Sequence, residues 1–156
     1  MQTMAATKRA SRGRRLDEIA EALPQRASAI SRLFLRHTTV EVSRTEANVM
    51  RALSTRPRRI TELAAGEGVT QPAMTLLVKR LEERGWLARG ADPADRRAVL
   101  VCLTHEGRRV FDLLRAEYRA LLHEEMATLP DADVQALARA VDILDGLIER
   151  LMVRTR

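Results

Sequence analysis

The sequence is poor in cysteine and in aromatic residues. Its 156 residues include one cysteine, one tryptophan, one tyrosine and two phenylalanines. A single cysteine excludes an internal disulfide framework and favours a cytosolic protein. The three histidines are scattered, and no two of them have the spacing of metal ligands on one helix. We therefore expect neither a bound metal ion nor a cofactor.

Long apolar runs and catalytic motifs are missing as well. No stretch approaches the roughly 20 apolar residues of a membrane span, and the first residues lack the pattern of a signal peptide. The chain has no glycine-rich phosphate loop and no nucleophile elbow. We therefore expect a cytoplasmic protein that is not an enzyme and does not bind membranes. Its length suits one domain with an apolar core.

The basic residues are unevenly distributed. The formal net charge is +6, and residues 1–15 contain five basic residues and no acidic one. Residues 51–100 are also basic, whereas residues 16–50 and 101–156 are slightly acidic. This distribution is typical of a DNA-binding module on a near-neutral scaffold. A general arginine bias of the composition is the alternative, and it explains the asymmetry less well.

The segment Val69–Gly85 predicts a recognition helix. Thr70 or Gln71 can cap its start, and Pro72 suits the first turn, where no N–H bond is lost. Gly85 is a typical residue after a helix end. Four apolar residues recur at helical spacing and form one buried stripe: Met74, Leu77, Val78 and Leu81. The opposite face carries Gln71, Pro72, Thr75, Leu76, Lys79 and Arg80.

Two flanking patterns place this helix in a larger motif. A short helix over Ile60–Ala65 and a turn with two glycines precede it. Two strand patterns, residues 86–89 and 97–103, follow it and are joined by a loop over residues 90–96. The sequence therefore predicts a winged helix-turn-helix, in which the second helix enters the DNA major groove.

Residues Asp92–Thr104, followed by Glu106 and Gly107, resemble the wing signature of the MarR family of transcriptional regulators. The upstream residues Leu63-Ala64, Gln71-Pro72 and Gly85-Trp86-Leu87 are similar to the helix-turn-helix of that family. The resemblance covers about residues 44–111. Leu76 stands where many members carry a basic residue.

The resemblance implies a set of DNA-contacting residues. In the wing, Arg97 suits a narrow minor groove, Asp95 can hold its guanidinium, and Arg96 is available for a phosphate. An ordinary surface ion pair between Asp95 and Arg97 is the alternative. On the recognition helix we expect contacts from Thr70, Gln71, Pro72, Ala73, Thr75, Lys79 and Arg80.

The segments before the motif are expected to be a disordered basic tail, residues 1–14, and a dimerisation helix within residues 15–40. Pro24 should kink or break that helix near Leu23. Ser43 and Glu46 form a capping-box pattern for the next helix. The arginines of residues 56–59 follow this helix, either touching the DNA backbone or lying in a solvated loop.

The segment after the motif, residues 104–153, predicts two helices separated by Pro130, with Thr104 capping the first. The last helix has apolar residues spaced three and four apart, which is the pattern of a helix–helix seam. Packing within the chain is one explanation, and self-association is the one we favour. The expected dimerisation residues are Leu16, Ile19, Leu23, Val134, Leu137, Val141, Leu144, Ile148 and Leu151.

The expected fold is therefore mainly α with a small β-hairpin wing, with the winged helix-turn-helix in residues 43–103 and helical dimerisation regions on both sides. The expected function is that of a homodimeric repressor on a palindromic operator in double-stranded DNA. The resemblance also implies release by a small-molecule effector, for which Phe34 and His37 are the candidate residues. The alternative is an adaptor module whose winged helix binds a protein.

Overall fold

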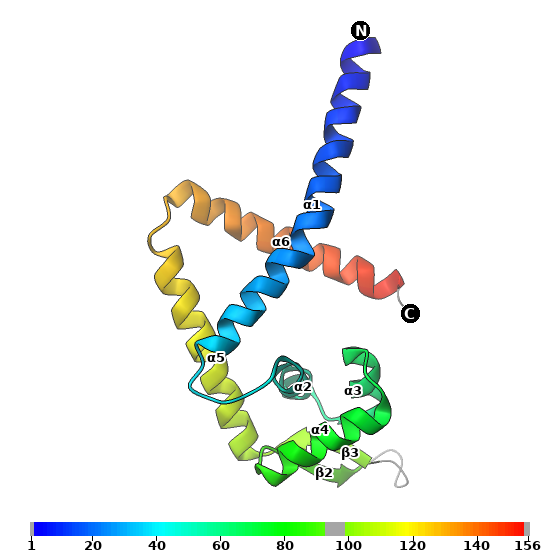
Figure 1. Cartoon of the computed structure of the whole chain (residues 1–156), viewed down its shortest axis with the longest axis vertical. Helices are drawn as coiled ribbons and strands as arrows, with labels where there is room; N and C mark the ends of the chain where they lie inside the picture. Colours follow the sequence, from blue (N-terminus) through cyan, green and yellow to red (C-terminus); the bar gives the residue numbers. More distant parts are fainter. Residues whose placement is uncertain (1, 93–98, 155–156) are drawn as a thin grey trace. The chain divides into compact units, whose positions relative to one another are not determined.

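The computed structural model describes residues 2–92 and 99–154 and divides the chain into two compact units, residues 1–115 and 116–156. The first unit contains α1 (Gln2–Arg36), α2 (Arg44–Thr55), β1 (Arg58–Arg59), α3 (Ile60–Glu67), α4 (Gln71–Glu83), β2 (Leu87–Ala91), β3 (Val99–Leu103) and the first part of α5 (His105–Met126). The second contains the end of α5 and α6 (Asp131–Arg154). Figure 1 shows this order of elements along the chain.

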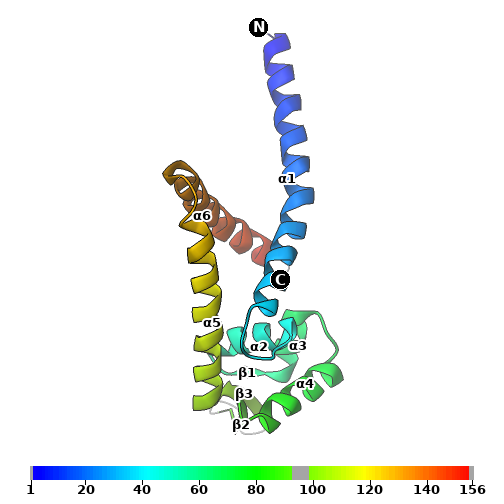
Figure 2. The same ribbon diagram turned by 60° about the vertical axis from the view of Figure 1, so that its left-hand side comes forward.

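The winged helix of the first unit is built on a three-stranded antiparallel sheet of order β1-β3-β2. Its hairpin pairs Leu87 with Leu103 and Ala91 with Val99. Helices α2, α3 and α4 gather beside this sheet (Figure 2). The mainly helical fold with a β-hairpin wing is confirmed.

The core of the first unit contains the predicted apolar stripe of α4 together with apolar residues of α2, α3 and the hairpin. Val49, Met50 and Leu53 of α2 are buried together with Leu63 and Ala64 of α3. The stripe of α4 is buried as well, and Trp86 is buried at the start of the hairpin. Burial of these side chains on facing elements fixes α4 against the sheet and against α3.

Two predicted helix caps are present. The backbone N–H of Glu46 donates to Ser43 Oγ at 3.3 Å, and the N–H of Ser43 donates to Glu46 Oε2 at 2.8 Å, which completes the capping box of α2. The N–H of Gly107 donates to Thr104 Oγ1 at 2.9 Å at the start of α5. These bonds satisfy backbone donors that lack partners inside the helices.

Helix α1 differs from its prediction at its N-terminal end, and of the two outcomes expected at Pro24, a kink or a break, the break is absent. It begins at Gln2, where a disordered tail over residues 1–14 was expected, and it continues through Pro24 without breaking in two (Figure 1). Residues 1–15 are rich in alanine, lysine and arginine, which favour helix, and extending an existing helix requires no new nucleus. Pro24 removes a single N–H bond, while the adjacent turns keep theirs.

The segment around residues 56–59 also differs from its prediction. Arg56 is the C-cap of α2, so the segment follows the helix end as expected, but Arg58 and Arg59 form β1, which pairs with Val101 and Leu100 of β3, and these two residues therefore lie in a strand and not in a solvated loop. At the wing, β2 extends to Ala91, so Gly90 and Ala91 belong to the hairpin and not to the loop. Both differences have the same cause, because β3 offers hydrogen-bonding groups on both of its edges.

At the start of α5, Gly107 lies very close to the backbone of Trp86. Gly107 is buried, and a Cβ atom placed on it would overlap the carbonyl oxygen of Trp86. We expect Gly107→Ala to lower the free energy of unfolding by about 1–3 kcal/mol or more, because the backbone of Trp86 has to move. Urea denaturation measures this loss.

The matched control is Gly66→Ala in α3, where an added Cβ meets no atom within 4 Å. Because alanine favours helix over glycine, this variant should gain up to about 1 kcal/mol. Equal stability of the Gly107→Ala variant and the unsubstituted protein would contradict the close approach.

Candidate nucleic-acid interface

The turn between α3 and α4 fixes the start of the candidate recognition helix. Gly68 has φ 64°, a left-handed conformation that favours glycine. The N–H of Val69 donates to the carbonyl of Ala64 at 3.1 Å, which closes the end of α3. Thr70 then caps α4, because its Oγ1 accepts from the N–H of Ala73 at 3.4 Å. The predicted cap, turn and helix are confirmed.

Helix α4 has two chemically distinct faces. The residues of its stripe, including Met74 and Leu81, are buried in the core. Gln71, Pro72, Ala73, Leu76, Lys79 and Arg80 are exposed, and Thr75 is half-buried with its Oγ1 donating to the carbonyl of Gln71. The exposed face therefore presents small and amide side chains at the N-terminal end and two cations one or two turns later.

No acidic residue occurs from Val69 to Leu81. The first acidic residues are Glu82 and Glu83 at the end of α4, and Lys79 Nζ lies 3.8 Å from Glu83 Oε1 in an exposed pair. Such a pair contributes less than about 1 kcal/mol, so Lys79 can exchange it for a phosphate. The face from Gln71 to Arg80 thus suits an anionic partner.

Arg84 connects the end of α4 to the segment before α2. Its Nη2 donates to the backbone carbonyl of Glu41 at 2.8 Å. The same guanidinium lies over the ring of Trp86, 3.5 Å from the centroid, which is a cation–π contact. Arg84 therefore holds the end of α4, the first residue before the hairpin and the loop after α1 together, a role that its position in the sequence did not indicate.

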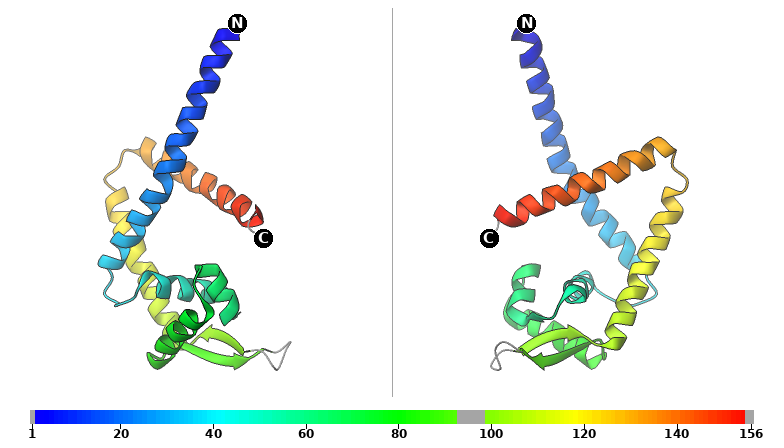
Figure 3. Two further views of the ribbon diagram at one scale, coloured as in Figure 1. Left: turned by 45° about the vertical axis from the view of Figure 1, so that its right-hand side comes forward. Right: turned by 180° about the vertical axis from the view of Figure 1, so that it is seen from behind.

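The wing is anchored at its base by ion pairs. Arg89 of β2 lies 3.1 Å from Glu82 of α4, and Arg59 of β1 lies 2.9 Å from Asp92, the residue after β2. Figure 3 shows β2 and β3 side by side as a hairpin. The predicted wing residues Asp95, Arg96 and Arg97 lie outside the described residues.

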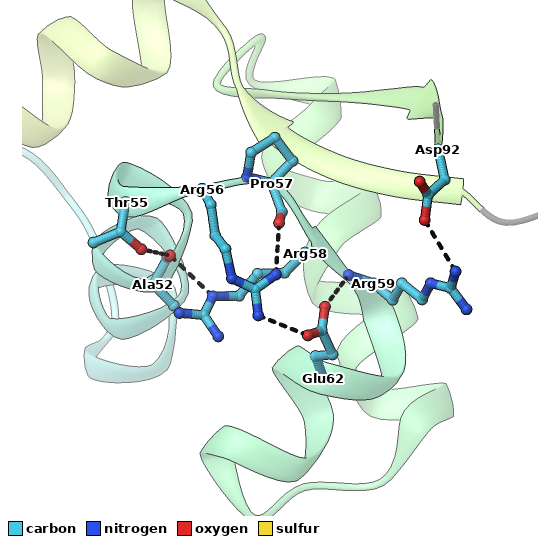
Figure 4. A network of polar contacts seen from close by, with 8 residues as sticks. All are labelled: Ala52, Thr55, Arg56, Pro57, Arg58, Arg59, Glu62 and Asp92. Atoms are coloured by element: carbon cyan, nitrogen blue, oxygen red, sulfur yellow. Dashed lines mark hydrogen bonds and ion pairs between the residues drawn. The ribbon is translucent and has the colours of Figure 1, made fainter. Parts of the chain in front are cut away.

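The arginines of residues 56–59 have internal partners (Figure 4). Arg56 Nη2 donates to Glu62 Oε1 at 2.8 Å, and Arg58 Nε donates to the carbonyl of Ala52 at 3.1 Å. The N–H of Arg59 donates to Glu62 Oε2 at 2.9 Å at the start of α3. These bonds attach β1 to α2 and α3, so the cluster has a structural role. A two-residue strand carries no periodic signal, so the sequence did not indicate it.

The hydrogen bond from Arg56 lowers the pKa of the Glu62 carboxyl below its ordinary value of 4.5, and the backbone N–H of Arg59 lowers it further. The same hydrogen bond raises the pKa of Arg56. Ionised Glu62 is therefore favoured by the folded state.

The predicted dimerisation residues lie on exposed helix surfaces. Leu16, Ile19 and Leu23 of α1 are exposed within the first unit. In the second unit, α6 has no buried residue among those described, and Leu144 is half-buried. Its other seam residues are all exposed: Val134, Leu137, Val141, Ile148 and Leu151.

Two other predicted features concern small molecules and metals. Phe34 is half-buried in α1, and His37 is exposed just after this helix. The backbone N–H of His37 donates to the carbonyl of Phe34 at 3.0 Å. Within residues 2–92 and 99–154, no three histidine, cysteine or acidic side chains gather as metal ligands would. No helix in the same residues has the length and apolarity needed to cross a membrane.

Comparisons with known proteins agree with this geometry. Residues 42–99 match the MarR family. An uncharacterized HTH-type transcriptional regulator of Mycobacterium bovis is 31% identical over 87 residues, which are 56% of this chain and 61% of that protein. The chain thus spans about three fifths of the length of the curated relatives that it matches first.

Solved structures share the fold. The crystal structure of a transcriptional regulator of Thermotoga maritima is 26% identical with a TM-score of 0.65, covering 86% of this chain and 94% of that one. A MarR family protein of Bacillus stearothermophilus is 18% identical with a TM-score of 0.72, covering 87% and 96%. The second likeness concerns the fold alone.

The lowered pKa of Glu62 generates a prediction about pH. Because the folded-state pKa lies below the unfolded value, ionised Glu62 stabilises the protein above pH 4.5 and loses this effect as the pH falls through the lowered pKa. We expect Glu62→Gln to lower the Tm at pH 7, and the difference from the unsubstituted protein to narrow in acid. Circular dichroism melts between pH 7 and 3 measure it. A difference that stays constant with pH would contradict the ion pair.

Proposed function

We propose that this chain is a transcriptional regulator of the MarR family, whose model matches residues 42–99, and that it binds double-stranded DNA as a homodimer. Two copies of α4, related by a two-fold axis, enter successive major grooves of a palindromic operator, about 34 Å apart. The protein acts in the cytoplasm and represses the genes beside the operator.

The observation that carries this proposal is the exposed face of α4. It has no acidic residue before Glu82, it has Lys79 and Arg80 at the cationic end, and its other side is buried in the core. The Thr70 cap and the left-handed Gly68 fix the residue at which the helix begins, and its first residues, Gln71 to Ala73, are exposed. A rigid helix with small side chains at its tip can approach base edges, while its cations bind phosphates.

Each α4 residue has a proposed role. Gln71 contacts base edges, with Thr70, Pro72, Ala73 and Thr75 around it, and Lys79 and Arg80 bind phosphates. Asp95, Arg96 and Arg97 of the wing approach the adjacent minor groove, Arg97 entering it and Asp95 orienting Arg97. A small-molecule effector that contacts Phe34 and His37 releases the DNA.

Substitutions in α4 separate the two kinds of contact. Lys79→Ala should weaken binding to operator and random DNA alike and reduce the slope of log affinity against log salt by about 1. Gln71→Ala should cost about 1–3 kcal/mol on the operator alone. Fluorescence anisotropy measures both, using a duplex selected by the protein from a random-sequence pool.

The control is Arg32→Ala, which removes an exposed cation of α1 outside the α4 face and should leave the salt slope unchanged. Equal losses on operator and random DNA for Gln71→Ala would remove its base-reading role. Failure to select any duplex at moderate salt would overturn DNA binding and favour a protein partner.

Self-association is supported by the apolar residues that α1 and α6 leave exposed. Val141 is 56% exposed in the single chain, and the other seam residues of α6 are exposed as well except Leu144, which is half-buried. An apolar seam of this length becomes stable when a second helix covers it. The proposed interface contains the seam of α6 together with Leu16, Ile19 and Leu23 of α1.

We expect a sedimentation mass near twice 17.6 kDa at micromolar concentration. Val141→Glu should shift the protein toward the monomer, because it places a charge in the seam. Gln135→Glu adds the same charge to the opposite side of α6 and should leave the mass unchanged. A monomeric unsubstituted protein would contradict the interface.

A further inference from the structure

Leu76 is an exception on the exposed face of α4. Its side chain is 64% exposed, whereas the other large apolar residues of the helix, Met74, Leu77, Val78 and Leu81, are buried. Leu76 therefore contributes little to the core of the first unit. Helical spacing places it next to Pro72 and Ala73 on one side and next to Lys79 and Arg80 on the other.

The residues around Leu76 indicate the chemistry of a partner that could cover this surface. Pro72, Ala73 and Leu76 form an apolar strip, because residues three and four apart share a helix face and all three are exposed. The strip continues into two cations and contains no acidic residue. A partner that covers it gains most if it has apolar groups flanked by regularly placed negative charges.

Duplex DNA has this combination in its major groove. The C5-methyl group of thymine is the apolar group on the base edges there, and phosphates border the groove on both sides. When the first turn of α4 lies at base edges, a residue one turn further along still faces the groove, since a helix rises only about 5.4 Å per turn. A leucine at that place can cover a methyl group but cannot donate or accept a hydrogen bond.

We propose that Leu76 is a specificity-determining residue that selects a thymine in each half-site through contact with its methyl group. This inference rests on the proposed DNA-binding function and adds to it a base preference carried by an apolar contact. Removing one methyl from the contact should weaken binding about fourfold, from the transfer free energy of one CH2 group. Removing the methyl group in both half-sites should weaken binding about fifteenfold.

The test uses a duplex that the full-length protein selects from a random-sequence pool. Each thymine is replaced in turn by uracil, which pairs identically and lacks only the methyl group. We expect the unsubstituted protein to lose about fourfold at one thymine position of a half-site. The Leu76→Ala variant should bind the thymine and uracil duplexes equally at that position.

Three controls separate this contact from other effects. Leu76→Met keeps a large apolar side chain and should retain the sensitivity to uracil. Lys79→Ala should lower affinity for both duplexes while preserving their ratio. Because Leu76 is exposed and alanine is a good helix former, Leu76→Ala should melt at nearly the same temperature as the unsubstituted protein, which circular dichroism checks.

The outcomes are distinct. Selection of no duplex would overturn the proposed function as a whole. A selected duplex whose uracil forms all bind the unsubstituted protein equally would overturn the role of Leu76 alone. The role of Leu76 would also be overturned if the Leu76→Ala variant lost as much affinity as the unsubstituted protein when uracil replaces thymine at the sensitive position.

Discussion

The winged helix depends on one junction, where the end of α4, both hairpin strands and the start of α5 meet. The carbonyl of Trp86 accepts from the backbone N–H of Thr104 at 3.0 Å and from its Oγ1 at 3.2 Å. The single hydroxyl proton of Thr104 is shared with the carbonyl of Gly85, which lies closer to Oγ1, at 2.7 Å. The N–H of Trp86 in turn donates to the carbonyl of Leu81. A shift of α4 relative to the base of the hairpin would break these bonds, so they hold the exposed face of α4 in a fixed position relative to the paired strands β2 and β3.

The parts of this unit that the sequence predicted are those with a periodic or local signal. The buried residues of α4 repeat at helical spacing, and Thr70 and Gly85 act on the residues beside them. The helix and its two ends could therefore be predicted from the sequence without knowledge of the tertiary structure. The strand β1 and the role of Arg84 could not be predicted, because their partners lie far away in the chain: β1 pairs with Leu100 and Val101, and Arg84 donates to the backbone carbonyl of Glu41. Helix α1 was misjudged for another reason, since composition alone does not tell a basic tail from a basic helix.

Two groups of basic residues in the first unit have different roles. The arginines at residues 56, 58 and 59 make hydrogen bonds or ion pairs with α2, with α3 and with Asp92, the residue after β2, and thereby fix the edge of the sheet. Lys79 and Arg80 instead stand on an exposed helix surface, and Lys79 has only a loose pair with Glu83. Net charge therefore overstates how many cations are available for a polyanion, and the distribution of charge over the folded surface is the more useful quantity.

The contact between Arg84 and Glu41 has an evolutionary consequence. Arg84 uses the main-chain oxygen of residue 41 and the ring face of residue 86. Almost any side chain at position 41 preserves that oxygen, so this position is free to drift. Position 84 is not free to change, because lysine lacks the planar guanidinium group, which can stack on an aromatic ring and donate a hydrogen bond in its own plane at the same time. Among distant descendants of this protein, the arginine at position 84 should persist while the residue at position 41 varies.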